Sequence, residues 1–303
     1  MKKKNLLKQW VNQRMLFKKL FVHSLVAIGF SNKHIQSLEI RNKVFRRINK
    51  KYSKVLDNLP YREDNQTPPK KIWFAWMQGI ENAPEVVKTC LETIKEHNKD
   101  CEVILITKEN FKDYTTIPEY ILEKYEKGII THTHFSDILR TNLLYENGGV
   151  WIDSTVYMTG PLPKHIFERP LFLLSSVCRG DELVRLFNSW FLAAQKGSFF
   201  MEAILKLIYA YWKKENHLRE YFLWHLFATI VGYKYPQAVE KIYRFSDANA
   251  EILRDVYFRP FDKEYWERLK EITPIHKLTY KLDEIPENVE GTFYDYVVNK
   301  KGQ

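Results

Sequence analysis

The segment from residue 134 to residue 155 constrains the fold most, because it joins a buried helix to a buried strand through two glycines. Its first half has apolar residues at the spacing of one helix face, namely Phe135, Ile138, Leu139 and Leu143. Gly148 and Gly149 favour a helix end there, because glycine accepts the left-handed backbone conformation. The apolar run 150–152 is typical of a strand buried on both faces. The segment therefore predicts a helix, a glycine turn and a central strand of an α/β fold.

Polar side chains gather at this helix and at the end of this strand. Asp137 and Arg140 lie about one helical turn apart, so they can point the same way. Asp153 directly follows the strand, and open α/β sheets bind ligands beyond the carboxyl ends of their strands. The three side chains can together hold a polar ligand. The alternative is a solvated helix pair and an aspartate that caps a turn.

The preceding segments predict a parallel pair of strands. Residues 70–79, KKIWFAWMQG, indicate an apolar strand, and Trp76 near its carboxyl end can offer a flat face to a nucleobase. A helix over 84–97 and a second strand over 101–107 follow. Strand, helix and strand in this order imply a right-handed crossover between parallel strands. Further along we expect strands over 156–158, 171–177 and 188–194, and helices over 117–126, 198–213 and 220–230.

The net charge of +10 is concentrated at the N-terminus. Residues 1–60 hold 15 of the 47 Lys and Arg residues and only two acidic residues. We therefore expect a basic module of two helices over residues 1–66, followed by one large domain over residues 67–303. A basic amphipathic helix can lie on an anionic membrane, and the alternative is a helical hairpin packed on the main domain. Nucleic-acid binding is not expected, because the sequence has no recognisable reader motif.

Composition narrows the class of protein further. Hydrophobic residues make up 45% of the chain and aromatic residues 15%, which argues against disorder. The three cysteines form no CxxC pair, so they indicate a reducing compartment. We find no secretory signal and no apolar run of about 18 residues. The sequence therefore predicts a cytoplasmic protein on the inner face of the cell membrane, held peripherally by its basic module.

The order SDILR, LLY and GGVWID resembles the signature of sugar-nucleotide glycosyltransferases of family 32, especially the bacterial capsular polysaccharide synthesis branch. The resemblance covers residues 68–165 well and the rest loosely. It implies a GT-A fold, which is an α/β fold with a mainly parallel central sheet. It also implies a retaining transferase that moves a hexose, galactose or glucose, from a UDP-sugar to a lipid-linked oligosaccharide. The alternative is a non-catalytic protein of the same fold that binds a sugar nucleotide or a glycan.

The same resemblance assigns roles to residues of this chain. Trp76 would stack on uracil, and Ser136 would meet the nucleoside part of the donor. Asp137 and Arg140 would hold the hydroxyl groups of the sugar. Together with Asp153 they are the predicted catalytic residues.

A metal site and a late loop complete the expected donor site. Asp153 matches the first acid of the DxD motif, whose third position is Thr155 in this chain. With His276, these two residues would hold Mn or Mg, although threonine is a weaker, neutral ligand. His276, Lys277 and Lys281 would reach the diphosphate from the segment 274–281, PIHKLTYK. The alternative is that this segment is an ordinary basic loop.

Overall fold

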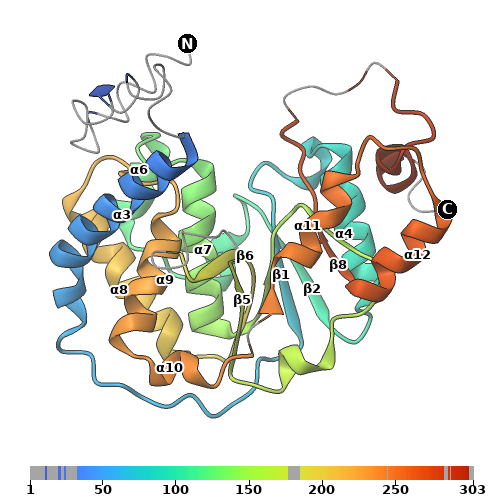
Figure 1. The fold of residues 1–303 in the computed structure, drawn as a ribbon. Helices are drawn as coiled ribbons and strands as arrows, with labels where there is room; N and C mark the ends of the chain where they lie inside the picture. Colours follow the sequence, from blue (N-terminus) through green and yellow to red (C-terminus); the bar gives the residue numbers. More distant parts are fainter. Residues whose placement is uncertain are drawn as a thin grey trace.

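The computed structural model describes residues 33–176, 185–243, 245–282, 286 and 288–299, and before them positions 11, 20, 21 and 24. The first predicted helix of the basic module falls almost entirely outside these residues. In the described part a central sheet carries helices on both faces (Figure 1). None of the described helices is both long and apolar enough to cross a membrane.

The middle layer is a six-stranded sheet in the order β2-β1-β3-β6-β5-β7. Its strands are β1 (Lys71–Ala75), β2 (Glu102–Ile106), β3 (Gly149–Ile152), β5 (Leu171–Ser175), β6 (Phe187–Ala194) and β7 (Phe245–Ser246). Strand β1 pairs in parallel with β2 and β3, and β5 pairs in parallel with β7. Only β6 runs against its neighbours β3 and β5. Five of these six strands therefore share one direction, which confirms the predicted mainly parallel sheet.

A second sheet of two strands has no strand pairing with the first. Strand β4 (Val156–Met158) pairs antiparallel with β8 (Ile275–Lys277). The segment 274–281 is therefore not simply a loop, because its first part is this strand. Both interpretations of this segment treated it as a loop, whereas Ile275–Lys277 form a strand. A strand of three residues is too short to show an alternation of apolar and polar residues in the sequence. Its formation depends on pairing with β4 and not on a local sequence pattern.

Two groups of helices cover the two faces of the large sheet (Figure 1). One face carries α3 (Lys33–Tyr52), α6 (Glu119–Glu126), α7 (His132–Asn147), α8 (Phe199–Lys214) and α9 (Leu223–Lys234). The other face carries α4 (Glu85–His97), α11 (Ala248–Asp255) and α12 (Lys263–Ile272). The short helices α5 (Phe111–Tyr114) and α10 (Gln237–Glu240) lie in the connections.

Side chains of β1 fill both cores. Ile72 and Phe74 belong to the cluster beneath α4, whereas Trp73 belongs to the cluster beneath α7 and α8. All three are fully buried, because successive residues of a strand point to opposite faces and both faces are covered. This explains why the sequence of the strand is apolar without alternation.

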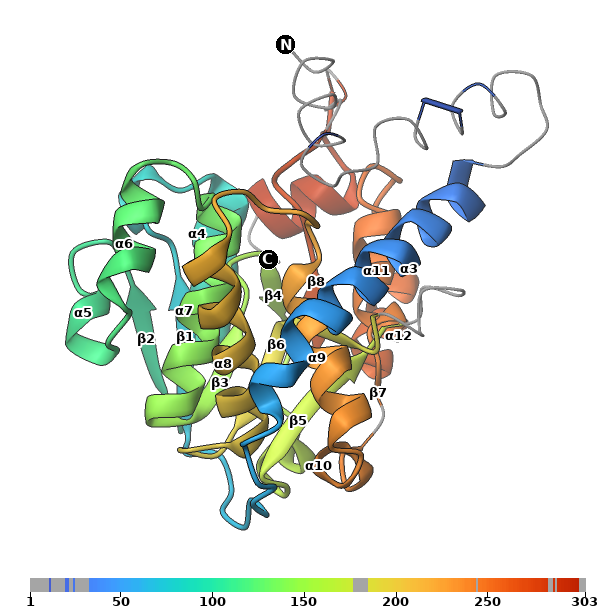
Figure 2. The ribbon, with the colours of Figure 1, turned by 90° about the vertical axis from the view of Figure 1, so that its left-hand side faces the viewer.

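Helix α3 is part of the main core. Its buried face, formed by Val44, Phe45, Ile48 and Tyr52, lies in the same hydrophobic cluster as α8 and α9. Figure 2 shows α3 running across these two helices. The ring of Phe45 meets Tyr233 of α9 edge-on at 6.4 Å. The second predicted helix of the basic module therefore shares its core with the domain predicted to begin at residue 67.

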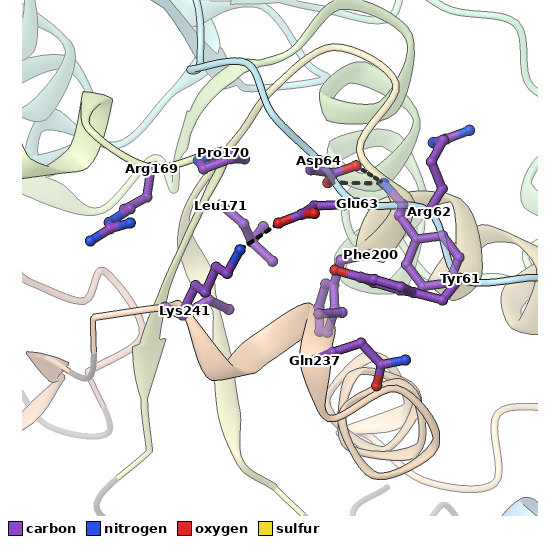
Figure 3. Close-up of a pocket in the computed structure, with 13 residues that line it drawn as sticks. Tyr61, Arg62, Glu63, Asp64, Arg169, Pro170, Leu171, Phe200, Gln237 and Lys241 are labelled. Carbon is purple, nitrogen blue, oxygen red and sulfur yellow. Dashed lines mark hydrogen bonds and ion pairs between the residues drawn. The ribbon is translucent and has the colours of Figure 1, made fainter.

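The linker after α3 encloses a small cavity. Asp64 accepts a hydrogen bond from the backbone N–H of Phe199 at the start of α8 (3.0 Å), and Glu63 pairs with Lys241 (Figure 3). The cavity has a volume of about 50 Å³, which holds a few water molecules. It lies beside α8 and α10 and contains no predicted site residue, so it is not the candidate site.

Candidate active site

Two glycines place β3 directly after α7. Gly148 has a φ of 71° and Gly149 a φ of 105°, which side chains rarely tolerate. A Cβ atom on Gly148 would also lie 2.6 Å from the backbone nitrogen of Lys196. One on Gly149 would lie 2.5 Å from the carbonyl oxygen of Lys71. The turn therefore requires glycine, and it brings Asp153 to the carboxyl end of β3.

A cavity of about 350 Å³ opens at the carboxyl ends of β1 and β3. Its volume falls in the range of small-molecule sites, and its position is where open α/β sheets bind ligands. Its walls come from the end of β1, from α7, from the end of β3, and from β8 with the loop that follows. The charged residues among those that line it are Asp153, Arg140, Arg254, Lys277 and Lys281. In the described lining four cations accompany one carboxylate, and Arg254 also pairs with Glu251 on its own helix at 2.9 Å. This excess of positive charge suits an anionic ligand such as a diphosphate.

Asp153 is held by donors on both of its oxygens. Trp151 donates its indole N–H to Oδ1 at 2.9 Å, and Nη2 of Arg140 lies 3.3 Å from the same oxygen. Lys277 donates to Oδ2 at 3.0 Å. Burial alone would raise the pKa of Asp153, but Lys277, Arg140 and these hydrogen bonds hold the pKa below its usual value. Asp153 is therefore ionised at neutral pH.

Arg140 is buried and fixed by its neighbours on α7 and β6. Its Nε and Nη2 donate to the carbonyl oxygen and the hydroxyl of Ser136, at 3.2 and 3.1 Å. Its Nη1 donates to the carbonyl oxygen of Ser189 on β6. The guanidinium also lies 4.9 Å from the ring centre of Trp151. The charge of Arg140 therefore has a defined position beside Asp153.

Asp137 lies beneath this layer instead of on the cavity wall. It is 6% exposed and is absent from the residues that line the cavity. One of its oxygens lies 3.4 Å from Nη2 of Arg140, and the other 3.4 Å from Nδ1 of His134. Because Asp137 does not line the cavity, this arrangement does not favour the expected direct contact between Asp137 and a bound sugar. The carboxylate is placed to orient Arg140, which does line the cavity.

The structure separates His276 from Lys277. The two are successive residues of β8, so their side chains point to opposite faces. His276 is fully buried, its Nε2 lies 3.1 Å from the hydroxyl of Thr159, and it does not line the cavity. Burial lowers the pKa of His276 to about 4, so its ring is neutral. A role of His276 in binding the donor or a metal stays a prediction, and its burial away from the cavity does not favour that role.

The remaining side chains do not fit the expected metal. Lys277 donates to Oδ2 of Asp153 at 3.0 Å and to Oγ1 of Thr155 at 2.8 Å, so its ammonium joins the two predicted ligands. Across the described ranges no group of three or more His, Cys, Asp or Glu side chains is placed to hold a metal ion. Use of Mn or Mg stays a prediction that this arrangement does not favour.

Trp76 and the late loop form another wall. Trp76 lines the cavity just beyond the carboxyl end of β1, and its ring meets Tyr280 edge-on at 5.5 Å. Its indole N–H has no hydrogen-bond partner within the described part of the chain. Lys281 lines the same cavity, with its ammonium 5.5 Å from the ring centre of Tyr280. The placement of Trp76 suits a nucleobase, and its stacking role stays a prediction.

Sequence reasoning missed several residues of the cavity. Trp151 shares a strand face with Asp153, because residues two apart in a strand point the same way, so its contact was readable from the sequence. Tyr280 adjoins the two predicted lysines of the late loop. Tyr221 and Arg254 come from the segment before α9 and from α11, and no local pattern indicated either.

Comparison with known families identifies one family that covers most of the chain. The family described as "Capsular polysaccharide synthesis protein" matches residues 6–297. The chain belongs to this family. The resemblance to the capsular polysaccharide synthesis branch is thereby confirmed, whereas membership of family 32 and the DxD motif stay predictions.

Individual relatives match shorter parts of this chain. O-glycosyltransferase braB of Annulohypoxylon truncatum is 22% identical over 161 residues, which is 48% of this chain and 38% of the relative. Subversion of eukaryotic traffic protein A of Legionella pneumophila is 26% identical over 147 residues, which is 41% of this chain and 22% of the relative. The matches thus span well under half the length of either relative.

Solved glycosyltransferases are also similar to this chain. The PaToxG glycosyltransferase is 16% identical, with a TM-score of 0.38, over 67% of this chain and 82% of the other. The glycosyltransferase GlyE of Streptococcus pneumoniae TIGR4 is 15% identical, with a TM-score of 0.42, over 77% of this chain and 60% of the other.

Proposed function

We propose that this capsular polysaccharide synthesis protein is a retaining glycosyltransferase of GT-A type. It transfers a hexose, galactose or glucose, from a UDP-sugar to a lipid-linked oligosaccharide in capsule or surface polysaccharide synthesis. One observation carries the proposal, namely the cavity at the strand ends, in whose described lining four basic side chains and Trp76 accompany one carboxylate, Asp153. The family match and the names of the similar proteins support the same class of reaction.

The cavity divides into parts that suit the parts of such a donor. Trp76 offers an aromatic face for uracil. Lys277 and Lys281 supply positive charge to a diphosphate, whose negative charge grows as the sugar leaves. Asp153, aligned by Arg140, supplies an ionised carboxylate for the sugar hydroxyls. No side chain is assigned as a covalent nucleophile, so we expect attack from the face that the diphosphate leaves.

A lipid-linked acceptor would bring the protein to the inner face of the cell membrane. The apolar face of α3 is covered by α8 and α9, so this face cannot insert into a lipid bilayer. Contact between α3 and the membrane would therefore be electrostatic. Its exposed basic side chains include Lys43, Arg46 and Lys50. Each basic residue near an anionic surface contributes about 1 kcal/mol of attraction.

A donor screen tests the proposal directly. The full chain is incubated with UDP-glucose, UDP-galactose and GDP-mannose, and both thermal stabilisation and donor hydrolysis are measured. Free ligand at 100 times its Kd stabilises a protein by about 2.7 kcal/mol. We expect one UDP-sugar to stabilise the protein and to be hydrolysed, and we expect Asp153→Asn to abolish hydrolysis in a protein that is still folded, with a lower melting temperature because Arg140 and Lys277 lose an ionised partner. Stabilisation without turnover would favour the non-catalytic binding protein, and no response to any donor would refute both.

A further inference from the structure

We propose that the ammonium group of Lys277 takes the place of the divalent ion in this site, so that sugar transfer proceeds without a metal. The inference rests on the proposed function, because it concerns the stabilisation of the departing diphosphate. It adds a catalytic residue to a site in which sequence comparison leads one to expect Mn or Mg.

The position of Lys277 is fixed by the backbone. Antiparallel pairing places Lys277 opposite Val156, the first residue of β4. Val156 directly follows Thr155, so Lys277 lies beside the segment that holds Asp153 and Thr155. The backbone N–H of Leu278 donates to the carbonyl oxygen of Thr155 at 2.7 Å, which locks this register. On the opposite face of β8, His276 is buried against Trp266 with the ring centres 6.2 Å apart. The strand therefore cannot turn over without exposing His276.

The contacts of Lys277 occupy the oxygens that a metal would need. Its ammonium lies 3.0 Å from Oδ2 of Asp153 and 2.8 Å from Oγ1 of Thr155. The other oxygen of Asp153 already meets Trp151 and Arg140. A divalent ion bound to the same pair of residues would lie against a fixed positive charge, and like charges at contact distance repel strongly.

The neutral side chain of Thr155 suits a bound cation of charge +1, such as the ammonium of Lys277, better than a divalent metal ion. A divalent ion is balanced by two carboxylates, whereas one ammonium is balanced by Asp153 alone. The hydroxyl of Thr155 then accepts a hydrogen bond without adding a second negative charge. An ammonium has three N–H donors. Two of them form the hydrogen bonds to Asp153 and Thr155, and the ammonium also lies 5.7 Å from the ring centre of Trp190. Because Lys277 lines the cavity, we expect its third N–H to donate to an anion there.

The transfer step balances with these groups. The bond between C1 of the sugar and the β-phosphate oxygen breaks, and its electron pair stays on that oxygen. The hydroxyl oxygen of the acceptor bonds to C1, and its proton passes to the same β-phosphate oxygen. Lys277 donates a hydrogen bond to the phosphate throughout and keeps its proton. The products are the glycosylated acceptor and the nucleoside diphosphate.

The test measures UDP binding and UDP-sugar hydrolysis by the full chain in EDTA and after Mn or Mg is added back. We expect wild-type hydrolysis to change less than twofold between the two conditions. Lys277→Gln should lose about 100-fold or more in kcat, the usual effect of removing one donor to a developing oxyanion, and should bind UDP more weakly in EDTA. Lys277→Arg should restore part of both, because it keeps the charge. Melting temperatures show whether each variant is folded.

A matched control separates this effect from a general loss of charge. Lys206 on α8 pairs with Glu202 at 3.7 Å and lies outside the cavity, so Lys206→Gln should leave both readings unchanged. Wild-type hydrolysis that is lost in EDTA and restored by Mn overturns the inference while the proposed function stands. Hydrolysis of no donor, with no UDP binding, refutes the proposed function itself. If Lys277→Gln does not fold, the EDTA measurement on the wild type alone decides.

Discussion

Replacing Glu215 with glutamine should weaken the protein at neutral pH but not in acid. Glu215 is 4% exposed and joins α3 to the end of α8. Its carboxylate accepts hydrogen bonds from Lys51 at 2.5 Å, Tyr52 at 2.8 Å and Arg219 at 2.8 Å. Burial alone would raise the pKa of Glu215, but these donors outweigh burial and lower the pKa from 4.5 to about 2. The carboxylate is therefore more stable in the folded chain than in the unfolded chain.

The size of the effect follows from this pKa difference. A shift of this size corresponds to about 3 kcal/mol of stability, and screening at the half-exposed Lys51 reduces it to about 2 kcal/mol. Because the folded pKa lies below the unfolded pKa, the contribution is complete above pH 4.5 and is lost as the pH falls towards 2. Glutamine cannot titrate, so the wild type and Glu215→Gln should converge in acid.

Urea unfolding at several pH values measures this difference. We expect Glu215→Gln to be less stable by about 2 kcal/mol at pH 7 and by a small fraction of that near pH 2.5. Glu123→Gln is the control, since Glu123 forms an exposed i,i+4 pair with Lys127 that contributes at most about 0.5 kcal/mol. An equal loss of stability at both pH values would refute the reasoning, because it would make the effect steric rather than ionic.

Three further predictions concern the site, the turn and the membrane. Trp76→Ala should weaken UDP binding by roughly 1–3 kcal/mol in calorimetry, and unchanged affinity in a folded variant would remove Trp76 from the base site. Gly149→Ala should lower the free energy of unfolding by about 1–3 kcal/mol or more, because φ is 105° and the new Cβ would lie 2.5 Å from the carbonyl oxygen of Lys71. An unchanged free energy of unfolding in this variant would contradict the prediction. Lys43→Glu, Arg46→Glu and Lys50→Glu combined should reduce binding to vesicles with phosphatidylserine, but binding that is insensitive to these changes and to salt would exclude α3 as the contact.

The part of the site that lies within one stretch of sequence was predictable. Helix α7, the glycine turn, β3 and Asp153 follow one another, so apolar spacing and two glycines were enough to place Arg140 near Asp153. Burial of β1 on both faces was likewise visible in its unbroken apolar run. The helix, the turn and the buried strands depend on local geometry, which can be inferred from neighbouring residues in the sequence.

The face of β8 could not be predicted, because it depends on pairing with a strand more than a hundred residues earlier. Read as a loop, the segment offers His276 and Lys277 equally to a ligand. Pairing with β4 imposes alternation, and alternation sends Lys277 into the cavity and His276 into the core. Histidine is the more usual metal ligand, so residue type alone assigned the metal to His276, whose side chain the structure buries away from the cavity.

The charge of the site shows the same dependence on tertiary structure and bears on how it works. Its cations come from α7, α11, β8 and the loop after β8, which meet only because the small sheet stands beside the carboxyl ends of the large one. Among the described residues that line the cavity, Asp153 is the one carboxylate. Outside this lining, Arg140 also meets Asp137 and Arg254 pairs with Glu251 at 2.9 Å. The described lining itself therefore carries more positive than negative charge before any ligand enters. A diphosphate would neutralise part of that positive charge on binding, whereas a divalent cation would add to it, and for this reason we propose an anion without a metal as the ligand of these charges.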